Sequence, residues 1–272
     1  MKWTPEAEAA IKKVPFFVRK KVRVRVEKEA HENGKPKIGI AEVNATKKRY
    51  LTRMESEVKG FQLDSCFGPN GCPNRAIEAD TLSRRLESLL KSEDLLGFLK
   101  KTVQGSLKFH HELRVTLADC PNACSQPQIK DIGIIGACVP ELTDKPCSRC
   151  EACVEICKED AVLFDDRGDA PEIDSEKCVK CGQCIPVCPT GTLAGRQKGY
   201  RVQLGGKLGR HPQLAREMPG IYSEEEVVLI IKDCIEFYKE KSRNGKRFAL
   251  IFKEEDFNRL IDRYKRENNR IG

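Results

Sequence analysis

The residues with the most distinctive chemistry in this sequence are its fourteen cysteines. Most of them lie in short blocks or close pairs, whereas the cysteines of a disulfide framework are usually spread along the chain. Thiolate side chains at such short spacing are typical metal ligands. The sequence therefore predicts metal ligation in a reducing compartment rather than disulfide bonding.

Two cysteine blocks of identical spacing lie in the central part of the chain. In each block, two residues separate neighbours among the first three cysteines, and three residues precede the fourth. The first block is Cys147, Cys150, Cys153 and Cys157, and the second is Cys178, Cys181, Cys184 and Cys188. The repeat indicates an internal duplication. Its spacing resembles that of bacterial two-cluster ferredoxins, in which such blocks hold two [4Fe–4S] clusters.

The resemblance to ferredoxins implies how two clusters would share these eight cysteines. One cluster is assigned Cys147, Cys150, Cys153 and Cys188, and the other Cys157, Cys178, Cys181 and Cys184. Lys158 stands where ferredoxins usually have the proline that Pro189 supplies in the second block, and this departure removes no ligand. Zinc is the alternative, because four thiolates also bind zinc, but zinc sites normally pair two Cys-x2-Cys hooks.

A second set of cysteines has a different spacing and consists of Cys66, Cys72, Cys120 and Cys124. It resembles the sulfite and nitrite reductase family, in which such a quartet binds a [4Fe–4S] cluster and the last cysteine sulfur bridges that cluster to siroheme iron. The resemblance continues through residues 119–136 and 199–215 and covers roughly residues 58–270. It assigns the bridging thiolate to Cys124. An inserted ferredoxin is typical of the dissimilatory members of this family.

This resemblance also implies clustered cations, because siroheme carries many carboxylates and the substrate is itself an anion. The expected catalytic residues are Arg114, Lys130 and Lys207, and the expected cofactor-binding residues are Cys124, Arg75, Gly205, Gly206 and Arg210. Arg114 lies six positions before Cys120, where relatives have a basic residue on the strand facing the haem. For each cation the alternative is an ordinary surface residue, and for the glycine pair it is an ordinary turn.

Three histidines and two cysteines lie outside these motifs but have side chains that could take part in chemistry. His110, His111 and His211 are either proton donors for the reduction or polar surface residues. Cys138 and Cys234 have no partner by spacing, so we expect them to be structural thiols.

Periodicity and capping residues predict mixed helices and strands. Residues 4–54 are predicted to form three helices, with Thr4 capping the first and breaks at Pro15 and Gly34. The VRVRV alternation in the second of these helices is also compatible with a strand. Further helices are predicted at 77–100, 224–241 and 254–266, and strands at 112–117, 201–204 and 248–252. This mixture predicts an α+β fold.

These observations divide the chain into three expected domains. Residues 56–143 and 192–272 form a siroheme and [4Fe–4S] reductase-like domain, and residues 144–191 form a bacterial-type ferredoxin domain inserted into it. Residues 1–55 form a small helical module. Its WTPEAE, VPFFVR and VEKEA segments resemble the helical module at the C-terminus of the B chain of light-independent protochlorophyllide reductase. By analogy this module covers a siroheme, and the alternative is that it only docks a partner or folds against the core. The half-domain that normally precedes the first cysteine pair of such reductases is not found.

The bulk composition limits the remaining possibilities. The formal net charge of +8 could serve an anionic cofactor, an acidic partner or nucleic acid, but no RNA-binding or helix-turn-helix signature is present. The sequence has no apolar run of membrane-spanning length and no signal-peptide core. We therefore expect a cytoplasmic protein without a membrane span that does not bind nucleic acid.

The favoured hypothesis is an enzyme that reduces sulfite or nitrite with siroheme and three [4Fe–4S] clusters, fed by an electron donor protein such as a ferredoxin or a redox subunit. The alternative is a non-catalytic electron-transfer or siroheme-binding subunit of a larger anaerobic redox complex. A zinc- or nucleic-acid-binding protein is the third possibility. Both homo-oligomers and hetero-oligomers are compatible with the sequence.

Overall fold

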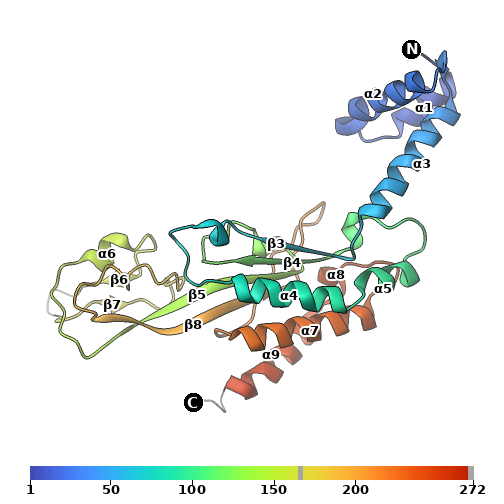
Figure 1. The fold of residues 1–272 in the computed structure, drawn as a ribbon. Coiled ribbons are helices and arrows are strands. Elements are labelled where there is room, and N and C mark those ends of the chain that lie inside the picture. The colour runs from blue at the N-terminus through green and yellow to red at the C-terminus, as the bar shows by residue number, and fades with distance from the viewer. Residues whose placement is uncertain (165–167, 269–272) are drawn as a thin grey trace. The chain divides into compact units, whose positions relative to one another are not determined.

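The computed structural model describes residues 1–164 and 168–268 (Figure 1). Contacts within the chain divide it into two compact units. The first, which we call the N-terminal unit, is Met1–Val58 with Val103–Phe109, and the second, the sheet unit, is Lys59–Thr102 with His110–Gly272.

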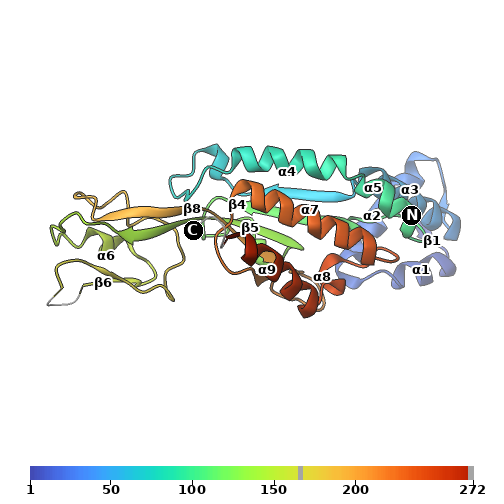
Figure 2. The same cartoon turned by 90° about the horizontal axis from the view of Figure 1, so that it is seen from below.

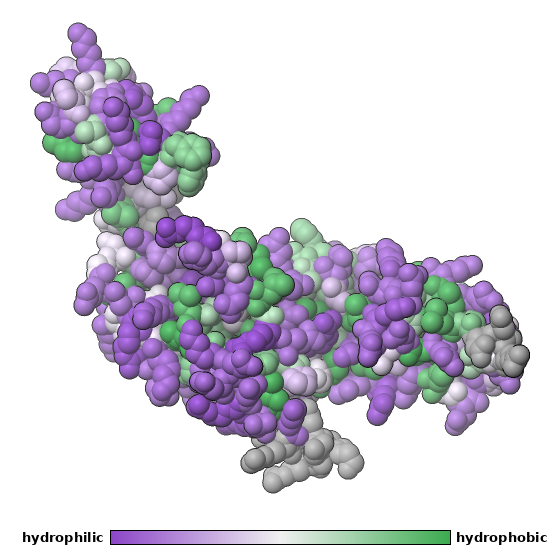
Figure 3. Space-filling model, turned by 180° about the vertical axis from the view of Figure 1, so that it is seen from behind, coloured by the Kyte–Doolittle hydropathy of each residue, from purple (hydrophilic) through white to green (hydrophobic). Residues whose placement is uncertain are grey.

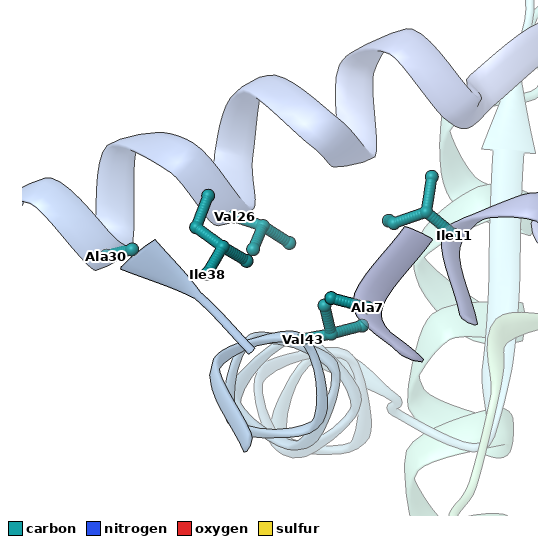
Figure 4. Close-up of a cluster of buried hydrophobic side chains, with 6 residues drawn as sticks. All are labelled: Ala7, Ile11, Val26, Ala30, Ile38 and Val43. Atoms are coloured by element: carbon teal, nitrogen blue, oxygen red, sulfur yellow. The ribbon is translucent and has the colours of Figure 1, made fainter. Parts of the chain in front are cut away.

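The N-terminal unit is built from three helices around a small apolar core. The helices are α1 (Pro5–Lys12), α2 (Phe16–Glu32) and α3 (Ile40–Glu57). Two short strands, β1 (Lys2–Trp3) and β2 (Lys37–Ile38), pair in parallel. Figure 4 shows the buried side chains that form the core, which are Ala7, Ile11, Val26, Ala30, Ile38 and Val43.

The three predicted helices are present, and their ends have the expected causes. The Ala7 N–H donates to Thr4 Oγ1 at 3.3 Å, so Thr4 caps α1 as predicted. The VRVRV segment is helical because Val22 and Val26, four residues apart, both face the core, whereas Val24 is 57% exposed. Gly34, with a φ of +65°, follows the end of α2.

The sheet unit contains a five-stranded mixed sheet with the order β3-β4-β5-β8-β9. Its strands are β3 (Phe61–Ser65), β4 (Leu113–Ala118), β5 (Ile132–Leu142), β8 (Leu193–Leu204) and β9 (Arg216–Glu217). The first three strands run parallel, and β5 with β8 and β8 with β9 are antiparallel. Because β3 and β4 are parallel neighbours, the residues that follow them emerge at the same edge of the sheet.

Helices cover one face of this sheet, as Figures 1 and 2 show from two directions. They are α4 (Asp80–Ser92), α5 (Leu95–Thr102), α7 (Glu224–Lys241), α8 (Phe248–Ile251) and α9 (Glu254–Asn268). Leucines of α4 and isoleucines of α7 are fully buried beneath the sheet, where α4 contacts β3 and α7 contacts β8. Short 3-10 turns lie at Gly68–Asn70 (η1), Phe109–His111 (η2) and Pro127–Ile129 (η3).

The duplicated cysteine blocks lie between β5 and β8. These two strands form a long antiparallel ribbon that pairs from Ile132 with Leu204 to Leu142 with Leu193, with one irregularity between Val139 and Pro140. Beyond the Leu142–Leu193 pair, the chain forms helix α6 (Ala152–Ile156) and a small antiparallel pair, β6 (Val162–Leu163) with β7 (Glu172–Ile173). The segment that carries both blocks therefore begins and ends at two neighbouring strands of the sheet.

Two expected elements differ from the prediction. The helix predicted over 77–100 is two helices, because Asp94 adopts a φ of +42° and its side chain accepts the Gly97 N–H at 3.1 Å. Residues 248–252 are predicted as a strand but begin with helix α8. Phe248 and Phe252 stack with ring centroids 4.7 Å apart, which is a contact that residues four apart make on a helix.

The remaining predicted elements of the sheet unit are confirmed, with α7 present over the predicted residues and β8 beginning well before the predicted start.

Within the described part of the chain, no helix combines the length and the apolar character that crossing a membrane requires. On the face drawn in Figure 3, hydrophilic residues predominate and hydrophobic residues lie between them in small groups.

Candidate metal centres

The quartet of cysteines with unequal spacing gathers around one cavity of about 70 Å³ in the sheet unit. Cys66 follows β3 and Cys120 follows β4, so the parallel register that pairs Ser65 with Leu117 brings them to one edge. The short loop through η1 returns Cys72 to the same place, and the turn before η3 carries Cys124. The structure thus brings together all four predicted residues.

Hydrogen-bond donors point at these sulfur atoms. The backbone N–H groups of Gly68 and Asp119 each donate to Cys66 Sγ at 3.3 Å, and Asn122 Nδ2 donates to Cys124 Sγ at 3.0 Å. Such donors stabilise sulfur in its negatively charged form. Burial, with a smaller contribution from the neighbouring thiols, raises the pKa of Cys120, and a cation among the four sulfurs would favour its thiolate form. This donor set fits a positively charged iron cluster.

A buried carboxylate, Asp119, supports the loop that carries Cys66 and Cys72. Its side chain is about 2% exposed, and burial raises the pKa of its carboxyl, which the nearby Arg75 opposes. Arg75 Nη1 donates to the Gly68 carbonyl at 3.0 Å, and its Nε lies 3.9 Å from Asp119 Oδ2. Arg75, predicted as a cofactor-binding cation, therefore lies against the cysteine loop, where it also pairs with Glu78.

Cysteines from the two ferredoxin-like blocks lie together as the crossed assignment predicts, completely for one group and for three members of the other. Four of their cysteines line one cavity of about 20 Å³, and these are Cys157, Cys178, Cys181 and Cys184. In the other group, Cys147 and Cys188 lie close enough to Cys153 to raise the pKa of its thiol, although burial is the larger cause. Cys150, the fourth predicted ligand of that group, is exposed.

Backbone donors accompany these sulfurs as well. The N–H groups of Arg149, Ala161 and Leu193 donate to Cys147, Cys157 and Cys188, at 3.3, 3.4 and 3.5 Å. Burial acts to raise the pKa of Cys188, but hydrogen bonds from its backbone and hydroxyl neighbours outweigh it and lower this pKa to about 7. The pKa of Cys184 is raised to about 12 by burial and by the adjacent thiols.

Among the described side chains, no three Cys, His, Asp or Glu residues lie close enough together to bind a single metal ion. An iron–sulfur cubane presents its irons at four corners, so its cysteine ligands are more widely spread than those of one ion. The cysteine groups described above are compatible with clusters in this respect.

The two cysteines outside these groups are buried thiols, as predicted. Cys234 lies in α7 and Cys138 lies in β5. Cys138 has a role that the spacing did not reveal, because its N–H donates to the Lys180 carbonyl at 2.8 Å and its backbone pairs with that of Cys181 as an isolated parallel β-bridge. A side chain at Gly182 would lie 2.8 Å from Cys138 Cβ. This contact fixes the second cysteine block against the ribbon.

The predicted catalytic cation Arg114 lies on β4 with its Nε buried, and that atom has no hydrogen-bond partner among the described residues. Arg114 shares a face of β4 with Thr116, whose hydroxyl contacts the Ser125 carbonyl at 3.4 Å, one residue after Cys124. Arg114 therefore lies on the face of the sheet that the cysteine turn covers.

Lys130 and Lys207, the other predicted catalytic residues, lie on segments that touch. Lys130 Nζ pairs with Asp64 Oδ2 at 2.7 Å. A side chain at Gly206 would lie 2.6 Å from the Lys130 carbonyl, so the glycine is required by close backbone packing. Gly205 has a φ of +84°, which is consistent with the turn that sequence reasoning left open.

The remaining predicted residues lie on exposed surface or away from the cysteines. Arg210 and His211 are exposed in the loop after Gly206. His110 and His111 precede β4, at the end of that strand opposite Cys120, and their rings are in contact with each other. Their position gives no support to a role as proton donors at the cysteine quartet.

Asp131 is a buried residue that sequence reasoning missed. Its carboxylate accepts the Arg114 N–H at 3.0 Å, an Arg247 Nη2 proton at 3.2 Å and the Ala249 N–H at 3.4 Å. Burial raises the pKa of Asp131, and Arg247 is the main opposing influence. The residue ties the start of β4 to helix α8. In the sequence, Asp131 is marked only by its position between Lys130 and the apolar run that begins at Ile132. This pattern is too common to identify a buried carboxylate.

Cysteine groups with inward-pointing N–H donors, carried on a mixed sheet with helices on one face, define an iron–sulfur protein of the α+β class. Comparison with known families places it more closely. Residues 61–270 match the family described as nitrite and sulphite reductase 4Fe-4S domain, and the chain belongs to that family. Residues 3–47 match the family described as proto-chlorophyllide reductase 57 kD subunit. The two resemblances expected from the sequence are thus confirmed.

Individual relatives agree with this placement. The chain is 29% identical over 203 residues to the coenzyme F420-dependent sulfite reductase of Methanocaldococcus jannaschii, covering 74% of this chain and 30% of that protein. It is 31% identical over 205 residues to the C chain of the anaerobic sulfite reductase of Salmonella typhimurium, covering 73% of this chain and 54% of that protein. The chain thus spans from about a third to about half of the length of these relatives.

Among solved structures, the crystal structure of dissimilatory sulfite reductase I matches with a TM-score of 0.50 and 17% identity. The match covers 79% of this chain and 56% of that one. At this identity the likeness concerns the fold, and it confirms the predicted α+β reductase fold.

Proposed function

We propose that this chain binds three [4Fe–4S] clusters and siroheme, and that it reduces sulfite or nitrite in the cytoplasm with electrons from a partner protein. The observation that carries the proposal is the cysteine quartet, which gathers around one cavity at the edge of two parallel strands and receives N–H donors. Membership of the nitrite and sulphite reductase 4Fe-4S domain family supports it.

The residues of the chain divide into ligands and anion-binding groups. The clusters would be held by the quartet and by the two crossed groups of the insertion, and the exposed Cys124 would also face siroheme iron. When bound, these groups would supply electrons and an open iron position. Arg114 would hold an anion, because its buried Nε–H donates to no acceptor among the described residues. Lys130 would have to exchange its contact with Asp64 to do the same.

The names of the relatives support a separate source of electrons. One is a subunit of an anaerobic sulfite reductase, and the other is named for its dependence on coenzyme F420. Both are longer than the stretch that this chain matches. We therefore propose that a further subunit or domain delivers the electrons, and that sulfite is the first substrate to test.

Anaerobic purification from a host that makes siroheme tests the cofactor content. We expect about twelve cluster irons per chain with a matching amount of labile sulfide. The optical spectrum should also show the Soret band of siroheme above the broad absorption of the clusters. Clusters without a Soret band would leave only the non-catalytic alternative.

The role of Cys124 is tested with Cys124→Ser, assayed for reduction of sulfite and of nitrite with reduced methyl viologen. We expect activity to fall by at least about 100-fold, because a ligand that tunes the metal is lost. Cys234→Ala is the matched control, since Cys234 is buried in α7 away from every cysteine group. Equal activity of Cys124→Ser and the control would remove Cys124 from the site.

A further inference from the structure

A cavity outside the cysteine groups lies in the N-terminal unit. Helices α1, α2 and α3 enclose an open cavity of about 710 Å³. Its size falls within the range of about 300–1,000 Å³ that is usual for small-molecule pockets. The cavity is open to solvent, so its lining is accessible to a ligand without a change of fold.

The wall of the cavity is apolar and is already positioned. Figure 4 shows the side chains of Ile11, Val26 and Val43 directed toward the shared interior of the unit. Val18 and Val22 extend this surface along α2 at a spacing of four residues, and both are only half-buried. An occupant with an apolar body would cover them and gain the free energy of removing that surface from water.

The rim of the cavity carries only positive charge. Four of the lining residues are cations, namely Lys13, Lys21, Arg25 and Lys47, and none of the lining residues is acidic. Two other cations of the unit do have carboxylate partners, since Arg23 pairs with Glu8 and Arg49 pairs with Glu29. In contrast, the three rim lysines form no ion pair with any described residue.

Arg25 adds a planar group to this rim, with its guanidinium 5.2 Å from the centroid of the Tyr50 ring. Tyr50 is 48% exposed and also lines the cavity. Arg25 also interacts electrostatically with Glu29, whereas the three lysines have no carboxylate partner among the described residues. An anion at the rim would supply these lysines with a charge of opposite sign. A second copy of the same unit would bring cations against cations, which makes self-association through this cavity unfavourable.

We propose that the N-terminal unit binds an amphipathic organic anion, with an apolar body in the cavity between α1, α2 and α3 and with its carboxylate or sulfonate groups at Lys13, Lys21, Arg25 and Lys47. The site is separate from the cysteine groups, so this inference is independent of the proposed reductase activity.

The test uses the full chain and a pair of probes that differ in charge. Anilinonaphthalene sulfonate is the anionic probe, and phenylnaphthylamine, which has the same rings without the sulfonate, is the neutral probe. Isothermal titration should give one site per chain that binds the anion more tightly than the neutral probe. Its affinity for the anion should fall as salt is raised, because the rim cations are exposed.

Variants then locate the site. Lys21→Gln should weaken anion binding about threefold, and a Lys21→Gln, Arg25→Gln double variant about tenfold, with little effect on the neutral probe. Lys20→Gln is the matched control, since Lys20 is the preceding residue on α2, is exposed and does not line the cavity. Val18→Trp should fill the cavity and abolish binding of both probes, with the helical circular dichroism retained.

Three results would overturn the proposal. The first is equal affinity for the two probes, and the second is an equal effect of Lys20→Gln and Lys21→Gln. The third is a dimer in size-exclusion chromatography that Val18→Trp converts to a monomer, which would identify a second copy as the occupant. Should Val18→Trp fail to fold, the two glutamine variants still decide the question.

Discussion

At the scale of single residues, the cysteine loop between Cys66 and Cys72 depends on one glycine. A side chain at Gly68 would lie 2.0 Å from Asp119 Oδ2 and 2.7 Å from Asp119 Cβ. Asp119 is buried, so it cannot swing into solvent to make room. The loop that delivers two of the four thiols is therefore fixed by the absence of one methyl group.

Gly68→Ala should displace this loop and release the iron held by the quartet. We expect the iron content to fall by about four atoms per chain, that is by one cluster, with the insertion's clusters retained. Gly71→Ala in the same loop is the control, because Gly71 has a φ of +88° but no neighbour within 4 Å of an added Cβ. It should cost about 1 kcal/mol of backbone strain and leave iron in place. Equal iron loss in both variants would assign the effect to backbone strain.

At the scale of elements, the start of β4 and helix α8 are held together by Asp131 and Arg247. The Asp131 side chain is 1% exposed and that of Arg247 is 13% exposed, and Arg247 Nη2 lies 3.2 Å from Asp131 Oδ1. Removing one partner of a buried pair leaves the other charge without compensation. Loss of either Asp131 or Arg247 alone should therefore destabilise the junction between β4 and α8.

Arg247→Leu should lower the free energy of unfolding by about 3–5 kcal/mol near neutral pH. The pKa of Asp131 is already raised by burial, and loss of Arg247 raises it further. Because the folded state then holds a proton that the unfolded state has released, stability falls as pH rises above the ordinary value of about 3.8 through the raised pKa. Denaturant titrations at several pH values should show a smaller deficit in acid. A deficit that grows in acid would contradict this assignment.

Much of the fold follows from local sequence, and the failures have a common cause. Helix α7 was predictable because Ser223 and Glu226 form a reciprocal cap at its start and apolar residues follow with helical periodicity. The segment from Phe248 to Ile251 was mistaken for a strand, since four apolar residues have no period of their own and their tertiary contacts decide.

The candidate site divides in the same way. The spacing of the two blocks was enough to predict the group of Cys157, Cys178, Cys181 and Cys184, whereas the quartet was predicted from its resemblance to a known family. Asp131, Asp119 and Cys138 were not assigned their roles, since those roles depend on contacts between distant strands. The cavity of the N-terminal unit was also missed, because its cations come from two helices and from the turn after α1.

At the scale of the whole molecule, all fourteen cysteines belong to the sheet unit and the single tryptophan belongs to the N-terminal unit. Trp3 is held by a hydrogen bond from its Nε1 to Glu27 Oε1 at 2.8 Å, and Arg23 lies over its ring. Tryptophan fluorescence therefore reports on one unit, whereas cluster absorption reports on the other.

Removal of iron with a chelator under reducing conditions should destabilise the sheet unit alone. The uncompensated thiols lose their common cation, and metal binding free energy is then lost from folding. We expect the main thermal transition in circular dichroism to move down by several degrees. The Trp3 fluorescence transition should stay where it was, with the iron-loaded chain as control. A shared shift of both signals would mean that the two units unfold together.

The antiparallel ribbon of β5 and β8 has a consequence for how such a chain could be assembled in the first place. Since Leu142 and Leu193 face each other as a register pair, the fifty residues between them could be exchanged for a two-residue hairpin turn without changing the direction of either strand. The segment between Leu142 and Leu193 could therefore be gained, lost or replaced as one unit in a single genetic event. The strands that carry the quartet would keep their topology in each case.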